Sequence, residues 1–167
     1  MNALLFPGQG SQQVGMGKDL YDNFDLVKKI FTEADECLKY DISKFILDGP
    51  AEKLQLTENT QPAILTVSYS IFKVFKEEFG LNLKKFSQFA GHSLGEYSAL
   101  VCAESLDFKD AIYLLHQRGK AMQNAVPVGQ GMMSAVLGME LNELKDLIEK
   151  QENKGVCEIA NDNAKGQ

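Results

Sequence analysis

A five-residue motif, GHSLG at 91–95, constrains the fold of this chain more than any other segment. It has the form G-x-S-x-G, in which a strand ends, the chain turns sharply and a helix begins, so that the serine stands at the apex of the turn. The flanking residues fit, because the apolar segment 86–90 precedes the motif and good helix formers at 96–101 follow it. The helix N-terminus would offer backbone N–H groups to a developing oxyanion, which makes Ser93 a candidate nucleophile.

Apolar patterning along the chain predicts alternating strands and helices. We expect Asn59 and Thr60 to cap a helix that has Pro62 in its first turn. This order of elements is typical of an α/β layer architecture with a parallel sheet. The expected strands are 2–6 and 86–90, and the expected helices are 24–38, 60–79, 95–104 and 107–125.

A second pattern begins after the stretch 127–131, which has the composition of a linker. We expect a strand at 132–137, a helix at 141–151 and a strand at 155–160, the start of a second β-α-β unit. The predicted domains are therefore a large α/β unit at 1–126 and the beginning of a small, incomplete unit at 131–167.

Composition limits the function classes open to this chain. The formal net charge is −6, whereas a nucleic-acid-binding protein usually carries a basic excess. No apolar run approaches the length of a membrane span, and the N-terminus lacks the basic region and long apolar core of a signal peptide. The three cysteines lie far apart without a C-x-x-C spacing, which indicates neither a metal site nor a disulfide framework. We therefore expect a cytoplasmic protein that binds no nucleic acid, membrane or metal.

One arginine lies on the apolar face of a predicted helix. On a helical wheel of 107–125, Arg118 falls inside the apolar arc between Ala111 and Leu114, while His116 falls on the polar arc and is expected to face solvent. A guanidinium that faces inward is costly unless it is paired. Two explanations are open: a structural ion pair with a core carboxylate, or a clamp for an anionic substrate, a task that the planar fork of arginine suits.

Four motifs occur in order along the chain: FPGQGSQ at 6–12, NTQPA at 59–63, GHSLGEYSAL at 91–100 and QRG at 117–119. Together they closely resemble the malonyl-CoA:acyl carrier protein transacylase family of bacterial fatty-acid biosynthesis, over essentially the whole chain. The resemblance implies an α/β-hydrolase-like parallel sheet with helices on both faces, plus the first part of a small ferredoxin-like α+β subdomain. It also implies transfer of the malonyl group of malonyl-CoA to the phosphopantetheine thiol of acyl carrier protein, with no bound cofactor.

The same resemblance assigns roles to individual residues. Ser93 matches the nucleophile that becomes acylated. The backbone N–H groups of Leu94 and Gln9 match the two donors of the oxyanion hole, which agrees with the need for donors from separate segments. Arg118 matches the arginine that binds the malonyl carboxylate.

Two further polar residues and the two histidines complete the candidate site. Gln61 and Asn161 match polar residues near the active site of the family, although segment 162–165 departs from the aromatic, asparagine, small residue and proline that usually follow. His92 adjoins the nucleophile, so its side chain is expected to point away from the hydroxyl proton and to pack or hydrogen-bond beside the substrate. With His116 facing solvent, neither histidine is a credible general base.

In the family, the catalytic histidine lies beyond the second domain. We therefore expect this chain to be truncated before that histidine and inactive by itself, with malonyl-CoA, acyl carrier protein and the missing C-terminal half of the same protein as its partners. Three alternatives stay open. They are the acyltransferase domain of a polyketide synthase, a serine esterase or thioesterase with a similar strand–turn–helix motif around its serine (a nucleophile elbow), and a non-catalytic fragment that binds carrier protein or CoA without turnover.

Overall fold

The structure is a computed structural model of the 167-residue chain and describes residues 2–126, 129–151 and 155–167. The chain divides into two compact units, Met1–Val128 and Gly129–Gln167. This division falls in the expected linker, of which residues 127 and 128 lie outside the described residues. In chain order the elements are β1 (Asn2–Phe6), α1 (Lys18–Asn23), α2 (Asp25–Leu38), α3 (Ile42–Leu47), α4 (Ala51–Leu54), α5 (Thr57–Glu77), the 3₁₀ turn η1 (Leu83–Lys85), β2 (Phe86–Gly91), α6 (Gly95–Cys102), α7 (Phe108–Ala125) and α8 (Leu141–Glu149).

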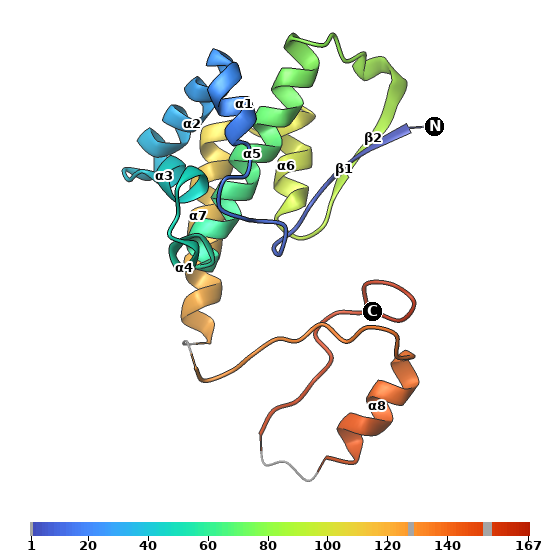
Figure 1. The fold of residues 1–167 in the computed structure, drawn as a ribbon. Coiled ribbons are helices and arrows are strands. Elements are labelled where there is room, and N and C mark those ends of the chain that lie inside the picture. The colour runs from blue at the N-terminus through green and yellow to red at the C-terminus, as the bar shows by residue number, and fades with distance from the viewer. Residues whose placement is uncertain (1, 127–128, 152–154) are drawn as a thin grey trace. The chain divides into compact units, whose positions relative to one another are not determined.

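Two parallel strands form the sheet of the first unit (Figure 1). Ala3 pairs with Gln88 and Phe6 with Gly91, so the carboxyl ends of β1 and β2 lie at the same edge. Parallel strands need a long crossover connection, and helices α1 to α5 supply it here. Both strands coincide with predicted segments, and the mixed α/β class expected from the sequence is confirmed.

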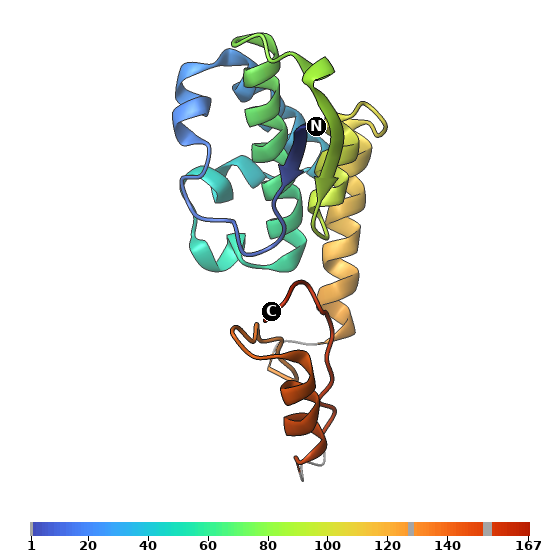
Figure 2. The same cartoon turned by 90° about the vertical axis from the view of Figure 1, so that its right-hand side faces the viewer.

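Helix α5 runs through the middle of the helical layer (Figures 1 and 2) and contacts α2, α6 and α7, while α6 also contacts both strands. The core between these elements is apolar, and each large side chain buried there contributes about 1.5–3 kcal/mol. This packing fixes α7 against α5. The largest fully buried apolar side chains are Phe31, Ile42, Ile46, Leu54, Leu65, Leu94, Ile112 and Leu115.

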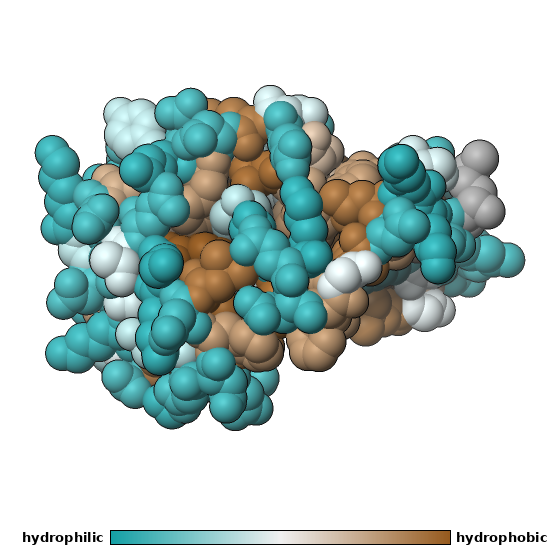
Figure 3. All heavy atoms as spheres, turned by 90° about the horizontal axis from the view of Figure 1, so that it is seen from above, coloured by the Kyte–Doolittle hydropathy of each residue, from teal (hydrophilic) through white to brown (hydrophobic). Residues whose placement is uncertain are grey.

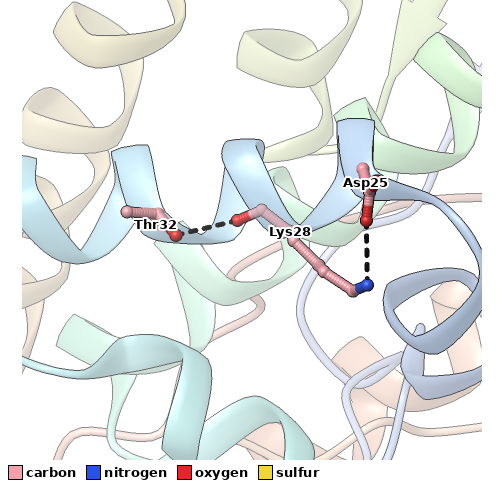
Figure 4. Close-up of polar contacts among 3 residues, drawn as sticks. All are labelled: Asp25, Lys28 and Thr32. Carbon is pink, nitrogen blue, oxygen red and sulfur yellow. Dashed lines mark hydrogen bonds and ion pairs between the residues drawn. The ribbon is translucent and has the colours of Figure 1, made fainter.

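Helix α2 shows how the covering helices are built. As predicted, its buried residues follow a helical spacing: Val27, Ile30, Phe31 and Ala34. On the outer face, Lys28 Nζ lies 2.9 Å from Asp25 Oδ1, and Thr32 Oγ1 donates a 2.9 Å hydrogen bond to the Lys28 carbonyl oxygen (Figure 4). The hydrogen bond between the two charged groups lowers the pKa of Asp25 and raises the pKa of Lys28. The pair stands in solvent, so it contributes little to stability.

Helix α5 begins earlier than predicted, because the carbonyl of Leu56 accepts 2.8 Å hydrogen bonds from the N–H groups of Asn59 and Thr60. These two residues therefore lie inside the helix and do not cap it. Their side chains instead donate to carbonyl oxygens of α4, which ties α4 to α5. Asparagine and threonine favour caps and such local side-chain bonds alike, so their presence could not decide the boundary. Pro62, predicted in the first turn, is the sixth residue of the helix.

The face that α7 buries differs from the predicted one. Its buried residues are Phe108, Ala111, Ile112, Leu115, His116 and Gly119. Leu114, predicted on the apolar arc, is 44% exposed, whereas His116, predicted in solvent, is only 8% exposed. The prediction was wrong at these positions because hydropathy alone defined the arc, while contact with the neighbouring helices selects a narrower stripe with a spacing of three and four residues.

The second unit contains one helix among its described residues, α8, which lies inside the predicted segment 141–151. Glu140 and Glu143 form a capping box at its start. The predicted strands at 132–137 and 155–160 are wrong, because neither segment forms a strand. Met132 and Val156, one from each segment, are both 90% exposed, so these apolar side chains gain no burial that would hold a strand in place.

An apolar groove of about 570 Å³ lies between β1, the loop that follows it and α5. Among its lining residues, Leu5 is 77% and Phe75 51% exposed. Figure 3, the view from above, shows apolar side chains at the surface between polar ones.

Within the described residues β1 and β2 are each other's only strand partners, so each has one unpaired edge. None of the described helices combines the length and apolar character needed to cross a membrane.

Candidate active site

The connection between β2 and α6 is a tight turn with Ser93 at its apex. Ser93 has a φ of +55°, a left-handed conformation that is uncommon for a residue with a Cβ. Glycines make the turn possible: a Cβ on Gly91 would clash with the backbone of Gly95, and a Cβ on Gly95 would lie 2.5 Å from the carbonyl oxygen of Phe6. The serine is exposed, in a strained backbone conformation, between the end of a strand and the start of a helix.

Arg118 reaches the hydroxyl of this serine from α7. Its Nη2 donates to Ser93 Oγ at 3.0 Å, and its Nη1 donates to Gln61 Oε1 of α5 at 2.7 Å. Gln61 is fully buried, and its Nε2 donates to Met122 Sδ at 3.3 Å. Arg118 forms no ion pair with a carboxylate of the described residues, so the structural ion pair is not what holds it there. Neutral groups, the Gln61 amide and the Ser93 hydroxyl, orient the guanidinium.

The glycine-rich loop after β1 lies against the serine turn. A Cβ on Gly8 would lie 2.9 Å from the carbonyl oxygen of His92 and 3.0 Å from its Nδ1. The loop is braced internally, because Ser11 Oγ donates to the Gly8 carbonyl at 2.9 Å. Gln9 in this loop and Leu94 directly after Ser93 therefore come from two segments in contact, which is one requirement for an oxyanion hole with two donors.

The two histidines have different surroundings. His92 is exposed and its imidazole lies beside Gly8. His116 is buried on α7, with Nδ1 3.0 Å from the Glu58 carbonyl oxygen and 3.4 Å from the Tyr40 hydroxyl. His116 was expected in solvent, and that expectation is wrong. Its ring is buried because Nδ1 lies within hydrogen-bond distance of these two polar groups.

The structure brings Ser93, Gln61 and Arg118 together in the first unit, whereas Asn161 lies exposed in the second unit. Sequence reasoning missed Met122 as the thioether partner of Gln61 and gave Gly119 no role. The second of these had a signal: a glycine inside a helix costs about 1 kcal/mol relative to alanine, which points to a close backbone approach.

One buried thiol lies on α6, close in sequence to the serine turn. Cys102 is 1% exposed, and burial raises the pKa of its thiol to about 12. A thiol with so high a pKa is almost entirely protonated at neutral pH and is a poor nucleophile. Cys102 is therefore a core residue.

Comparison with known proteins settles the family. The family model of the acyl transferase domain matches residues 3–164. The chain belongs to this family. Over 166 residues it is 50% identical to the malonyl CoA-acyl carrier protein transacylase of Bacillus subtilis (strain 168), covering 99% of this chain and 51% of that protein. The protein of the same name from Escherichia coli (strain K12) is 44% identical over 165 residues, covering 99% of this chain and 52% of the relative.

A solved structure agrees with these relatives. The acyl-carrier-protein-S-malonyltransferase from Bartonella henselae matches with a TM-score of 0.89 and 45% identity, covering 99% of this chain and 53% of that one. The chain therefore spans about half the length of the relatives that it matches. The resemblance stated from the four motifs is confirmed.

Proposed function

We propose that this chain carries the nucleophile and the carboxylate clamp of a malonyl-CoA:acyl carrier protein transacylase of fatty-acid biosynthesis. The observation that carries the proposal is the 3.0 Å hydrogen bond from Arg118 to Ser93 Oγ. A nucleophilic hydroxyl beside a cation without a carboxylate partner suits an acyl group that bears a negative charge at its far end. The names of relatives at 50% and 44% identity, malonyl CoA-acyl carrier protein transacylases, support the same pair of substrates.

The reaction takes place in two acyl transfers. Ser93 Oγ first attacks the thioester carbonyl of malonyl-CoA; the Oγ–C bond forms, the C–S bond breaks, and CoA leaves as its thiol with the proton of the serine. The phosphopantetheine thiol of acyl carrier protein then attacks the malonyl-serine ester, and the proton returns to Ser93. Arg118, oriented by Gln61, pairs with the distal carboxylate. An uncharged acyl group would leave the guanidinium unpaired, which disfavours its transfer.

Negative charge develops on the carbonyl oxygen in both transfers. We assign its stabilisation to the backbone N–H groups of Leu94 and Gln9. The first follows the nucleophile at the start of α6, and the second belongs to the loop that packs against His92. His92 thus shapes the substrate site through this loop, and Asn161 is a further polar group for the substrate.

The hydroxyl of Ser93 needs a base to accept its proton. Arg118 has no acceptor atom, and His116 is hydrogen-bonded to a carbonyl of α5. We propose that the base comes from a polypeptide equivalent to the part of the relatives that this chain does not span. The apolar groove beside β1 and the unpaired strand edges would receive it. The completed sheet would be α/β-hydrolase-like with helices on both faces, and the second unit would become part of a ferredoxin-like subdomain.

Intact-protein mass after brief incubation with malonyl-CoA tests the nucleophile. The chain alone is expected to react slowly or not at all, and addition of the C-terminal half of the Bacillus subtilis relative should produce a malonyl-sized adduct. The Ser93→Ala variant should give no adduct under either condition. No adduct in the mixture, or an adduct on Ser93→Ala, would contradict the proposal, and no gain on mixing would contradict the need for a partner.

Arg118→Ala tests the carboxylate clamp in the same mixture. Malonyl transfer should fall strongly, and selectivity should relax toward acetyl-CoA. Lys120→Ala, an exposed change on the same helix, is the matched control and should leave both unchanged. An unaltered ratio of malonyl to acetyl transfer in Arg118→Ala would refute the clamp. Rapid hydrolysis of the adduct by water would instead favour an esterase or thioesterase.

A further inference from the structure

Pro62 removes the normal helical donor for one backbone carbonyl of α5. In an α-helix the carbonyl of residue i accepts from the N–H of residue i+4, and proline has no N–H. The carbonyl affected is that of Glu58, in the first turn of the helix. A carbonyl that loses this donor is satisfied by water or by a group of a neighbouring element.

His116 of α7 supplies that bond. Its Nδ1 lies 3.0 Å from the Glu58 carbonyl oxygen. A carbonyl oxygen only accepts, so Nδ1 carries the hydrogen. The Tyr40 hydroxyl, 3.4 Å from the same nitrogen, donates its own proton to Asn59 Oδ1 at 2.8 Å. The rings of Tyr40 and His116 also pack together, with centroids 5.6 Å apart.

This contact lies next to the pair that orients the clamp. Arg118 follows His116 by two residues on α7, and Gln61 follows Glu58 by three residues on α5. The two helices also meet at Glu58 through Gly119, where a Cβ would lie 2.5 Å from the Glu58 Cα. The 2.7 Å hydrogen bond between Arg118 and Gln61 joins the same two helices.

We propose that His116 is a positioning residue for the acyl transfer. By supplying the donor that Pro62 removes, it fixes α7 against α5 and so holds Arg118 on Gln61 beside Ser93. The inference rests on the proposed function for the task of Arg118, whereas the hydrogen bond and its effect on the guanidinium can be tested without any catalysis.

Nitrogen-15 NMR tests the geometry directly. The chain has two histidines, so comparison with His92→Gln assigns the His116 signals, which should show the Nδ1–H tautomer. Arg118 is the only arginine, so its guanidinium signals need no assignment. His116→Leu should speed hydrogen exchange of the guanidinium roughly three- to tenfold, as expected for about one net hydrogen bond. His116→Asn, whose Nδ2 takes the place of Nδ1, should preserve slow exchange. An Nε2–H tautomer, or unchanged exchange in His116→Leu, would overturn the proposal.

A double-mutant cycle tests the link to Pro62. Pro62→Ala restores an N–H four residues after Glu58, so the carbonyl gains a donor besides the histidine. In urea unfolding, His116→Leu should raise the unfolding equilibrium constant roughly tenfold with proline at 62 and only about threefold or less with alanine there. Equal effects in the two backgrounds would overturn the link, because a histidine that only fills space would cost the same in both.

The mass assay in the presence of the C-terminal half gives the functional measurement. The ratio of malonyl to acetyl adduct should fall in His116→Leu and recover in His116→Asn. An unchanged ratio in His116→Leu would overturn the positioning role. If the unsubstituted chain forms no adduct, the proposed function fails, while the NMR measurements and the mutant cycle still decide whether His116 holds Arg118.

Discussion

The left-handed conformation of Ser93, with a φ of +55°, predicts that glycine is more stable than alanine at this position. Ser93→Gly and Ser93→Ala both remove Oγ and its hydrogen bond to Arg118, so the difference between them isolates the backbone. A Cβ in the left-handed region costs about 1–2 kcal/mol. Glycine loses about 0.4–1 kcal/mol relative to alanine through its freer unfolded chain. The midpoints of these ranges make Ser93→Gly the more stable variant by about 0.8 kcal/mol.

The variants Gln117→Ala and Gln117→Gly on α7 serve as the control, because their stabilities should have the opposite order. Gln117 is exposed in the interior of that helix, where alanine is more stable than glycine by about 1 kcal/mol. Urea unfolding of the four variants, followed by circular dichroism, measures both differences on one chain. Similar slopes against urea would show that the denatured states are comparable. Alanine more stable than glycine at both positions would refute the left-handed turn, and with it the turn geometry on which the proposed role of Ser93 as nucleophile depends.

Three further predictions follow from packing and from the buried thiol. Gly119→Ala should lower the free energy of unfolding by about 1–3 kcal/mol, because the new Cβ meets helix backbone that cannot move aside; stability equal to that of Lys120→Ala in urea would contradict this. Because burial raises the pKa of Cys102 from 9.0 to about 12, the folded chain keeps a proton that the unfolded chain releases. The free energy of unfolding should therefore fall as pH rises through this interval, and Cys102→Ala should flatten the fall measured by urea titration at each pH. Alkylation near neutral pH, followed by peptide mass, should modify the exposed Cys157 long before Cys102.

Sequence patterning predicted the elements whose signals are local. The spacing of Val27, Ile30, Phe31 and Ala34 sufficed for α2, because one apolar stripe on one helix carries the information. The segments 132–137 and 155–160 have strand-like composition but form no strand, since a strand exists only with a partner to pair with. Met132 and Val156 are exposed, so they make few of the contacts that would hold a strand, and composition alone does not show whether such contacts exist.

In the candidate site, too, the local sequence predicted some features and not others. The glycine spacing around Ser93 predicts the turn, because only glycine allows the backbone approaches at Gly91 and Gly95. The inward face of Arg118 came from the helical wheel, but setting aside the structural ion pair required its actual partners, Gln61 and the serine itself. Those partners lie 57 and 25 residues away in the sequence, beyond the reach of any local pattern.

His116 shows what polarity alone misses and what backbone chemistry adds. A histidine among polar neighbours on a helical wheel is expected in solvent, and the structure instead buries it against α5. Pro62 contains the missing information, because a proline inside a helix leaves the carbonyl four residues earlier without its donor. An element that packs on that turn can bring the donor, and an imidazole is suited to the task because its ring supplies an N–H. We therefore infer that the position of Arg118 depends on a hydrogen bond that the backbone of α5 cannot make by itself and that His116 supplies.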